Sequence, residues 1–260
     1  MFEMLLLVQP QLPMTTVSTD KLFDQYVRPA LFSEENRILL GTSLMIMLAG
    51  TFTLQFVGHT YFADGYLDVE SPGFWIIIGN AVFVTSILLL NKQAGEWTWS
   101  NLGFAKPKTW WHPILIGTGL LATLFLLAVY VQPFFLELGP QRDLTHLMVI
   151  RQNKQVLILA LCLVWITAAF LQELIFRAFL INSLDIFLGR NKWSTWVAVF
   201  TSAVIFGLLH AWQGIGGILF TGIIGLIFGI AYVLNSRRIW PLIFAHGLMD
   251  TISLVGIYNM

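Results

Sequence analysis

Long apolar stretches recur along most of the chain, and each has the length of a membrane-spanning helix. A helix that rises about 1.5 Å per residue needs about 20 apolar residues to cross the hydrocarbon core of a bilayer. The stretches cover residues 38–57, 73–91, 113–134, 155–184, 194–212, 215–234 and 238–257. This pattern predicts an all-α, polytopic membrane protein of about seven to eight transmembrane helices.

The composition agrees with this pattern. Of the 260 residues, 57% are hydrophobic and only 11% are charged, whereas roughly a quarter are charged in a soluble domain. The formal net charge is zero, so no overall field draws the chain towards nucleic acid. We therefore expect the lipid bilayer, and not nucleic acid, to surround the protein.

Residues 1–37 are predicted to form a cytoplasmic or interfacial segment, with an amphipathic helix near 22–32.

The distribution of basic residues predicts the orientation in the membrane. Lys and Arg collect on the cytoplasmic side of membrane proteins. With the N-terminus inside, the inner segments hold Lys21, Arg28, Arg37, Lys92, Lys106, Lys108, Arg190, Lys192, Arg237 and Arg238. The outer segments hold only Arg142, Arg151 and Lys154. We expect an integral multi-pass protein of the cell membrane with a cytoplasmic N-terminus.

Ionisable residues are confined to the last four predicted spans. Placing such a side chain at the centre of a bilayer costs at least ~2.5–3.5 kcal/mol, so these groups face the bundle interior or a water-filled cavity. They are Glu173, Arg177, His210, His246 and Asp250. The first three spans contain none, which predicts a transmembrane scaffold over residues 38–154 and a polar cavity in the C-terminal half, residues 155–260.

The spacing of these residues suggests two pairs. Glu173 and Arg177 are four residues apart, as are His246 and Asp250, so each pair shares one face of its helix. Each pair is equally consistent with a structural role, and a lone histidine such as His210 is often a core residue. From the predicted depth of each helix, we expect the five side chains to converge in the inner half of the bilayer, open to the cytoplasm.

Other small and polar residues in the chain are interpreted as packing features. Gly225 and Gly229 are four residues apart in an apolar run, the spacing that lets two membrane helices approach closely. His59, His112 and His146 lie in loops or at the edges of spans and show no metal-ligand spacing. We assign these three histidines no role.

Three short motifs resemble those of the CAAX-protease and bacteriocin-processing (CPBP, or Abi) family of intramembrane endopeptidases. The family's first motif, two glutamates and an arginine, corresponds to QELIFR, residues 172–177. Its second motif, phenylalanine and histidine, corresponds to FGLLH, residues 206–210, and its third to HGLMD, residues 246–250. Order and spacing agree for all three. The resemblance covers roughly residues 155–257.

The resemblance implies hydrolysis of a peptide bond within the membrane by an activated water molecule, without a covalent intermediate. In the family, the first glutamate is the general base and acts with the histidine of the second motif. Carried over, His210 would position the water, His246 would donate to the developing oxyanion and Asp250 would support His246. Arg177 would hold Glu173 and shape the floor of the cavity.

The chain departs from the family at the first glutamate, where it has Gln172. A carboxamide does not accept a proton near neutral pH. One explanation is that Glu173 serves as the base while Gln172 binds the water or the scissile carbonyl. A second is that the chain is a natural non-catalytic member that binds peptides or partner helices. A third explanation is a deliberate replacement of glutamate to inactivate the enzyme.

The same residues leave other functions open. Glu173, His210, His246 and Asp250 are donors that zinc accepts, but the chain lacks the HExxH pattern, so we expect no cofactor. A binding or scaffold protein, and a proton-coupled transporter, are alternatives to the peptidase. The transporter is disfavoured because no inverted repeat is visible. A peptidase would act on a membrane peptide or protein, such as a prenylated C-terminus or a leader peptide.

Overall fold

The computed structural model describes residues 34–61, 65–94, 97–139 and 145–260. The expected amphipathic stretch 22–32 lies outside them, as does most of the predicted N-terminal segment 1–37. Within the described residues every regular element is helical. The elements are α3 (Glu34–Tyr61), α4 (Pro72–Ala94), η3 (Ser100–Phe104), α5 (Trp111–Tyr130), α6 (Gln132–Leu136), η4 (Thr145–Ile150), α7 (Lys154–Leu163), η5 (Val164–Gln172), η6 (Leu174–Ile181), α8 (Asn182–Phe187), α9 (Lys192–Leu208), η7 (Ala211–Gln213), α10 (Gly214–Leu234) and α11 (Trp240–Tyr258).

The predicted class, a polytopic all-α membrane protein, is confirmed. Six helical stretches of the described chain are long and apolar enough to cross a membrane: Ile38–Tyr61, Pro72–Ala94, Trp111–Tyr130, Lys154–Phe187, Ala211–Leu234 and Trp240–Tyr258. The predicted stretch 194–212 forms the shorter apolar helix α9, which ends at Leu208. The helix ends before His210, because the chain there leaves helical geometry and then turns at Gly214 with a φ of 77°.

The helix that carries the first motif is unusually long and contains π-helical turns. It runs without a break for 34 residues through α7, η5, η6 and α8. At about 1.5 Å per residue this corresponds to about 50 Å, which exceeds the roughly 30 Å hydrocarbon core. The π-helical stretches η5 and η6 lie on either side of Glu173. Such turns are rare and occur often at functional sites.

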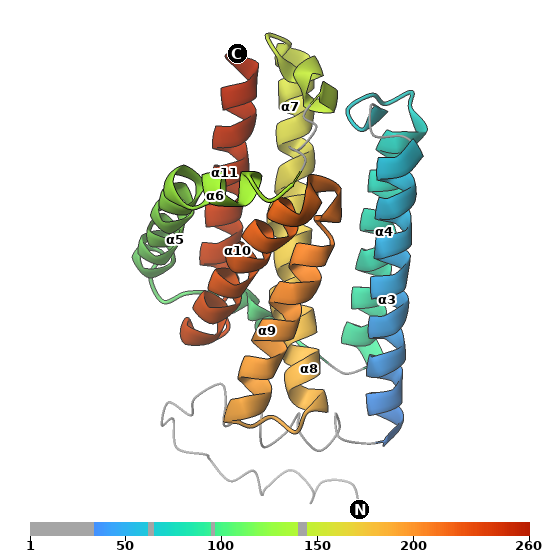
Figure 1. The fold of residues 1–260 in the computed structure, drawn as a ribbon. Coiled ribbons are helices and arrows are strands. Elements are labelled where there is room, and N and C mark those ends of the chain that lie inside the picture. The colour runs from blue at the N-terminus through green and yellow to red at the C-terminus, as the bar shows by residue number, and fades with distance from the viewer. Residues whose placement is uncertain (1–33, 62–64, 95–96, 140–144) are drawn as a thin grey trace, which may run out of the picture.

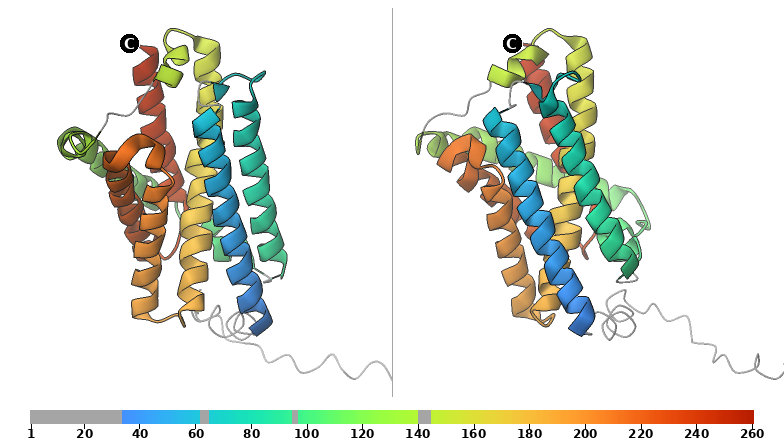
Figure 2. Two further views of the ribbon diagram at one scale, coloured as in Figure 1. Left: turned by 45° about the vertical axis from the view of Figure 1, so that its right-hand side comes forward. Right: turned by 90° about the vertical axis from the view of Figure 1, so that its right-hand side faces the viewer.

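The other helices pack around this long helix. Figure 1 shows α3 and α4 as an antiparallel pair along one side, with α9, α10, α11 and α5 on the other. The left view of Figure 2 shows the same separation, and in the right view the α3–α4 pair faces the viewer. The start of α3 and the α8–α9 turn lie at one end of the molecule, which we call the basic end because Lys92, Arg190 and Lys192 belong to it. The α3–α4 connection and the C-terminus lie at the opposite end.

Close packing of α9 against α10 confirms the role predicted for the two glycines. A Cβ atom at Gly225 would lie 3.1 Å from the ring of Phe206 and 3.2 Å from the backbone of Ala203. A Cβ atom at Gly229 would lie 2.9 Å from Val199. The two helices therefore approach each other at distances that leave no space for larger side chains.

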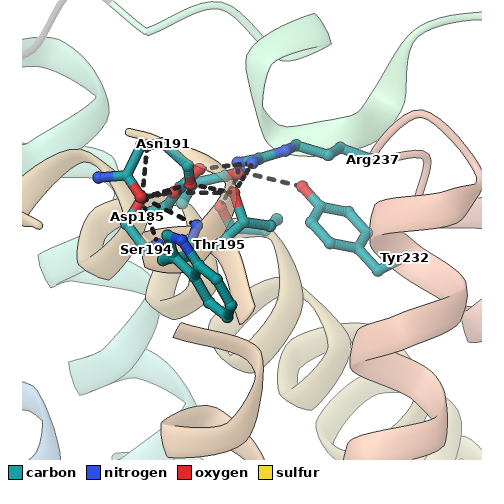
Figure 3. Close-up of polar contacts among 9 residues, drawn as sticks. Asp185, Asn191, Ser194, Thr195, Tyr232 and Arg237 are labelled. Carbon is teal, nitrogen blue, oxygen red and sulfur yellow. Dashed lines mark hydrogen bonds and ion pairs between the residues drawn. The ribbon is translucent and has the colours of Figure 1, made fainter. Parts of the chain in front are cut away.

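A polar network at the basic end connects two turns. Asp185 is fully buried and accepts hydrogen bonds from the hydroxyls of Ser194 (2.6 Å) and Thr195 (2.9 Å). It also forms an ion pair with Arg237 (Figure 3). Asn191 caps α9 by accepting from the backbone N–H of Ser194 at 3.0 Å. The network ties the α8–α9 turn to the α10–α11 turn and so fixes the start of α11, which carries the third motif.

Candidate functional site

A cavity of about 270 Å³ lies between the α3–α4 pair and the long helix. Gln172 of the first motif and His210 of the second motif both line this cavity. The remaining lining residues are Thr51, Leu54, Gln55, His59, Tyr66, Ile76, Ile77, Asn80, Ala81, Val84, Thr167, Leu171, Ile175, Phe176, Leu209 and Trp212. The cavity thus brings together two of the sequence-predicted residues, one from η5 of the long helix and one from the turn after α9.

His210 lies in the turn that follows α9, where a hydrogen bond defines its tautomer. Its Nδ1 atom is 2.7 Å from the carbonyl oxygen of Phe206. A carbonyl oxygen only accepts, so Nδ1 carries the proton and the lone pair of the neutral ring is on Nε2. The ring also lies against that of Phe206, with the two centroids 4.8 Å apart. Phe206, the first residue of the second motif, therefore orients the histidine.

Glu173 is fully buried and contacts two basic side chains. One carboxylate oxygen, Oε1, is 2.7 Å from Nδ1 of His246, and the other, Oε2, is 3.1 Å from Nε of Arg177. Glu173 does not line the cavity, although its neighbour Gln172 does. Successive residues of a helix point about 100° apart, so two adjacent side chains face different surroundings. The structure therefore places Gln172 in the cavity and Glu173 outside it.

Arg177 is buried among three aromatic rings. Its exposed fraction is 1%, and its guanidinium carbon lies 4.6 Å from the ring centroid of Phe206, 5.4 Å from that of Phe228 and 5.9 Å from that of Phe176. Cations at such distances are attracted by the face of an aromatic ring. Within the described residues, neither terminal nitrogen of Arg177 has a hydrogen-bond partner. The rings and Glu173 therefore supply its stabilisation.

The third motif completes a chain of charges. Nε2 of His246 lies 3.6 Å from Oδ2 of Asp250, whose side chain is 31% exposed. Arg177, Glu173, His246 and Asp250 thus alternate in sign when the imidazole is protonated. An isolated buried charge is costly, and partners of opposite sign offset that cost. The structure brings these four residues together, while His210 faces the cavity with Gln172.

The cavity also uses residues that sequence reasoning missed. Gln55 of α3 and Asn80 of α4 line it, although both helices were expected to form only a scaffold. The polar cavity therefore lies between the two halves of the chain and is not confined to residues 155–260. Both amides interrupt apolar runs, and this interruption was the signal in the sequence that could have identified them. An amide is a weaker signal than a charge, because it is less costly to bury.

Aromatic and imidazole rings form the wall of the cavity nearest the α3–α4 connection. His59 stacks on Trp212, with ring centroids 4.7 Å apart, and Tyr66 meets His59 edge to face at 5.1 Å. His146 contacts the edge of the same indole at 5.9 Å. Burial raises the pKa of Tyr66 to about 12, so its hydroxyl stays protonated at neutral pH. His59 and His146, which were assigned no role, thus belong to or support this wall.

The position of the cavity bears on the expectation that it opens to the cytoplasm. Along α3 and α4 the lining residues extend towards the α3–α4 connection, where Tyr66 lies. This connection is at the end opposite to the basic end (Figure 1). With a cytoplasmic N-terminus, as the charge bias predicts, the cavity would lie nearer the outer side of the membrane than the cytoplasmic side.

The donor set also bears on metal binding. Within the described residues, no three His, Cys, Asp or Glu side chains are arranged so that they could hold a metal ion. Of the four residues considered as zinc ligands, Glu173 is paired with Arg177 and His246, and His210 lies apart in the cavity. The geometry of the four side chains thus does not fit a shared ion.

The region that carries the three motifs matches a known protein family. Residues 154–252 match the family model described as Rce1-like, type II CAAX prenyl endopeptidase. No curated protein and no solved structure matches the chain. All three motifs, residues 172–177, 206–210 and 246–250, fall inside the matched region. The family implies a peptide or protein substrate within the membrane. This match confirms the resemblance seen in the three motifs: residues 154–252 of this multi-pass membrane protein are similar to the CAAX-protease and bacteriocin-processing family of intramembrane endopeptidases.

Proposed function

We propose that the protein hydrolyses a peptide bond of a membrane-embedded substrate in the cavity shared by Gln172 and His210. The observation that carries this proposal is that side chains from the first and second motifs line one cavity. A cavity within a bundle, lined by apolar residues and a few convergent polar groups, is the usual setting of a binding or active site.

In this proposal His210 takes the proton of the attacking water. Its tautomer has the lone pair on Nε2, because Nδ1 donates to Phe206. The water oxygen bonds to the scissile carbonyl carbon while its proton moves to Nε2. His210 then returns this proton to the leaving nitrogen, which yields a carboxylic acid and an amine. The amide of Gln172 holds the water or the carbonyl, and general base catalysis contributes typically ~10²–10⁴-fold.

We assign Glu173 a positioning role, in place of the base role that was one of the alternatives left open by the sequence. It is fully buried, outside the cavity lining, hydrogen-bonded to His246 and ion-paired with Arg177. A base must come within hydrogen-bond reach of the proton that it abstracts. Glu173 instead orients His246, whose two ring nitrogens face the carboxylates of Glu173 and Asp250. His246 is also outside the cavity lining, so we assign it a positioning role in place of the oxyanion donor that the resemblance implied.

A second candidate is a peptide-binding member of the family that performs no hydrolysis. Gln172, in the position of the family's first glutamate, faces the cavity beside His210, and a carboxamide does not act as a base near neutral pH. A protein of this kind retains the fold and the cavity and lacks turnover. The same geometry thus supports both candidates, and they differ only in whether His210 alone suffices as the base.

Cleavage of a mixed peptide library that includes prenylated C-termini and leader peptides tests both candidates. The purified protein in nanodiscs is compared with Gln172→Glu and His210→Ala, and products are identified by mass spectrometry. We expect the native protein to cleave and His210→Ala to lose ~10²–10⁴-fold in kcat. Cleavage by Gln172→Glu alone would establish the non-catalytic candidate. Undiminished cleavage by His210→Ala would refute the mechanism.

The orientation and the absence of a cofactor belong to the same proposal. We propose that the N-terminus is cytoplasmic in the cell membrane, so that substrates enter the cavity from the outer side, near the α3–α4 connection. Cysteine labelling at Asp68 in the connection and at Lys192 at the basic end, with a membrane-impermeant reagent on intact cells, tests this. We expect labelling at position 68 only. Labelling at position 192 only would show that the N-terminus is outside and would refute the proposed orientation. Hydrolysis should persist in the presence of a chelator.

A further inference from the structure

Three carboxamides from three different helices meet in the cavity. Gln55 lies on α3, Asn80 on α4 and Gln172 on η5, and all three line the cavity. The side-chain oxygen of each is buried and has no hydrogen-bond partner within the described residues. Buried polar atoms in folded proteins nearly always have a partner, so each exception requires an explanation. Three exceptions in one cavity indicate an occupant that donates hydrogen bonds.

The remainder of the lining indicates that this occupant carries no charge. Among the described residues that line the cavity, none is Asp, Glu, Lys or Arg. The hydroxyls of Thr51 and Thr167 and the protonated phenol of Tyr66 add neutral polar groups. A charged side chain in the cavity would find no fixed opposite charge. The complementary ligand is therefore neutral and presents several N–H donors.

An extended peptide backbone has these properties. Its amides are neutral, regularly spaced N–H donors, and extended peptides are commonly bound through main-chain hydrogen bonds. Resting on the proposed function for the nature of the occupant, we propose that Gln55, Asn80 and Gln172 form a subsite that accepts hydrogen bonds from backbone N–H groups of an uncharged substrate segment. Gln55 and Asn80 lie outside residues 154–252. The scaffold helices thus contribute substrate recognition that the three motifs do not.

Peptide retention measures this subsite without requiring turnover. The protein in nanodiscs is incubated with an equimolar library of uncharged octapeptides, and the retained peptides are quantified by mass spectrometry after gel filtration. Gln55→Leu and Asn80→Leu each replace a hydrogen-bond acceptor by an apolar side chain of similar size. Gln93→Leu is the matched control, because it makes the same change at an exposed position of α4 outside the cavity.

We expect about tenfold lower retention for Gln55→Leu and for Asn80→Leu, the equivalent of ~1.4 kcal/mol, and unchanged retention for Gln93→Leu. A second library with N-methylated backbone amides should bind the native protein about tenfold more weakly and should show no further loss with the two variants. Equal retention of both libraries by the native protein, or unchanged retention by both cavity variants, would overturn the subsite.

The outcome is separable from that of the proposed function. If peptides are retained through Gln55 and Asn80 and no form of the protein cleaves them, the subsite stands and the hydrolytic function fails. If peptides are cleaved and KM is unchanged in Gln55→Leu and Asn80→Leu, the function stands and the subsite fails. Gel-filtration profiles of the variants identify any loss of fold.

Discussion

The buried pair between Glu173 and Arg177 gives a quantitative test of the site. Arg177→Met keeps a long, apolar side chain and removes the positive charge. Glu173, which is fully buried, then retains the 2.7 Å contact with His246. Removing one partner of a buried ion pair typically costs ~3–5 kcal/mol, because the other charge stays desolvated. Because His246 remains in place, we expect the lower end of this range, about 3 kcal/mol.

The assay is thermal unfolding of the purified protein in detergent at one fixed scan rate. For a protein of this size, each 1 kcal/mol shifts Tm by ~2–4 °C, so Arg177→Met should lower Tm by ~6–12 °C. Arg151→Met, at an exposed position, is the control for the loss of an arginine at the surface. Its Tm should stay within ~2 °C of the native value, because surface substitutions change stability by only ~0.5 kcal/mol.

A double variant separates the charge imbalance from lost packing. When both charges are removed, in Glu173→Gln with Arg177→Met, no desolvated carboxylate is left, and pairs replaced in this way are often close to neutral in stability. We expect the double variant to recover more than half of the loss in Tm. A decrease in Tm of less than ~2 °C in Arg177→Met would refute the conclusion that the pair is desolvated. A double variant less stable than the single one would refute the coupling between the two charges.

Two further predictions concern stability elsewhere in the fold. Arg237→Ala should lower Tm by ~6–12 °C, since it leaves its fully buried aspartate partner without a counter-charge. Arg238→Ala, which breaks no ion pair within the described residues, should leave Tm unchanged. Gly247→Ala should cost ~1–3 kcal/mol, because the new Cβ would lie 2.7 Å from the indole ring of Trp165. Gly256→Ala on the same helix has open space around it and should stabilise by up to ~1 kcal/mol. Equal effects of the two alanines in unfolding scans would contradict this packing.

The sequence by itself determined the class of the protein and the resemblance of residues 154–252 to a known family. Apolar runs of about 20 residues predict helices in a bilayer because no other arrangement of a single run satisfies the backbone there. The i, i+4 spacing placed Glu173 with Arg177, because residues four apart share one helix face. It likewise placed His246 beside Asp250, and the structure brings both pairs together. These results depend on local geometry, which the sequence specifies directly.

Only the tertiary structure decided which way each polar side chain faces. The sequence placed Gln172 and Glu173 side by side, but the packing of α11 against the long helix buries Glu173 beside His246, and Gln172 faces the cavity. The same packing brought Gln55 and Asn80, from helices far away in the chain, to that cavity. Burial and cavity lining depend on how separate helices meet, and hydropathy along a single helix does not contain that information.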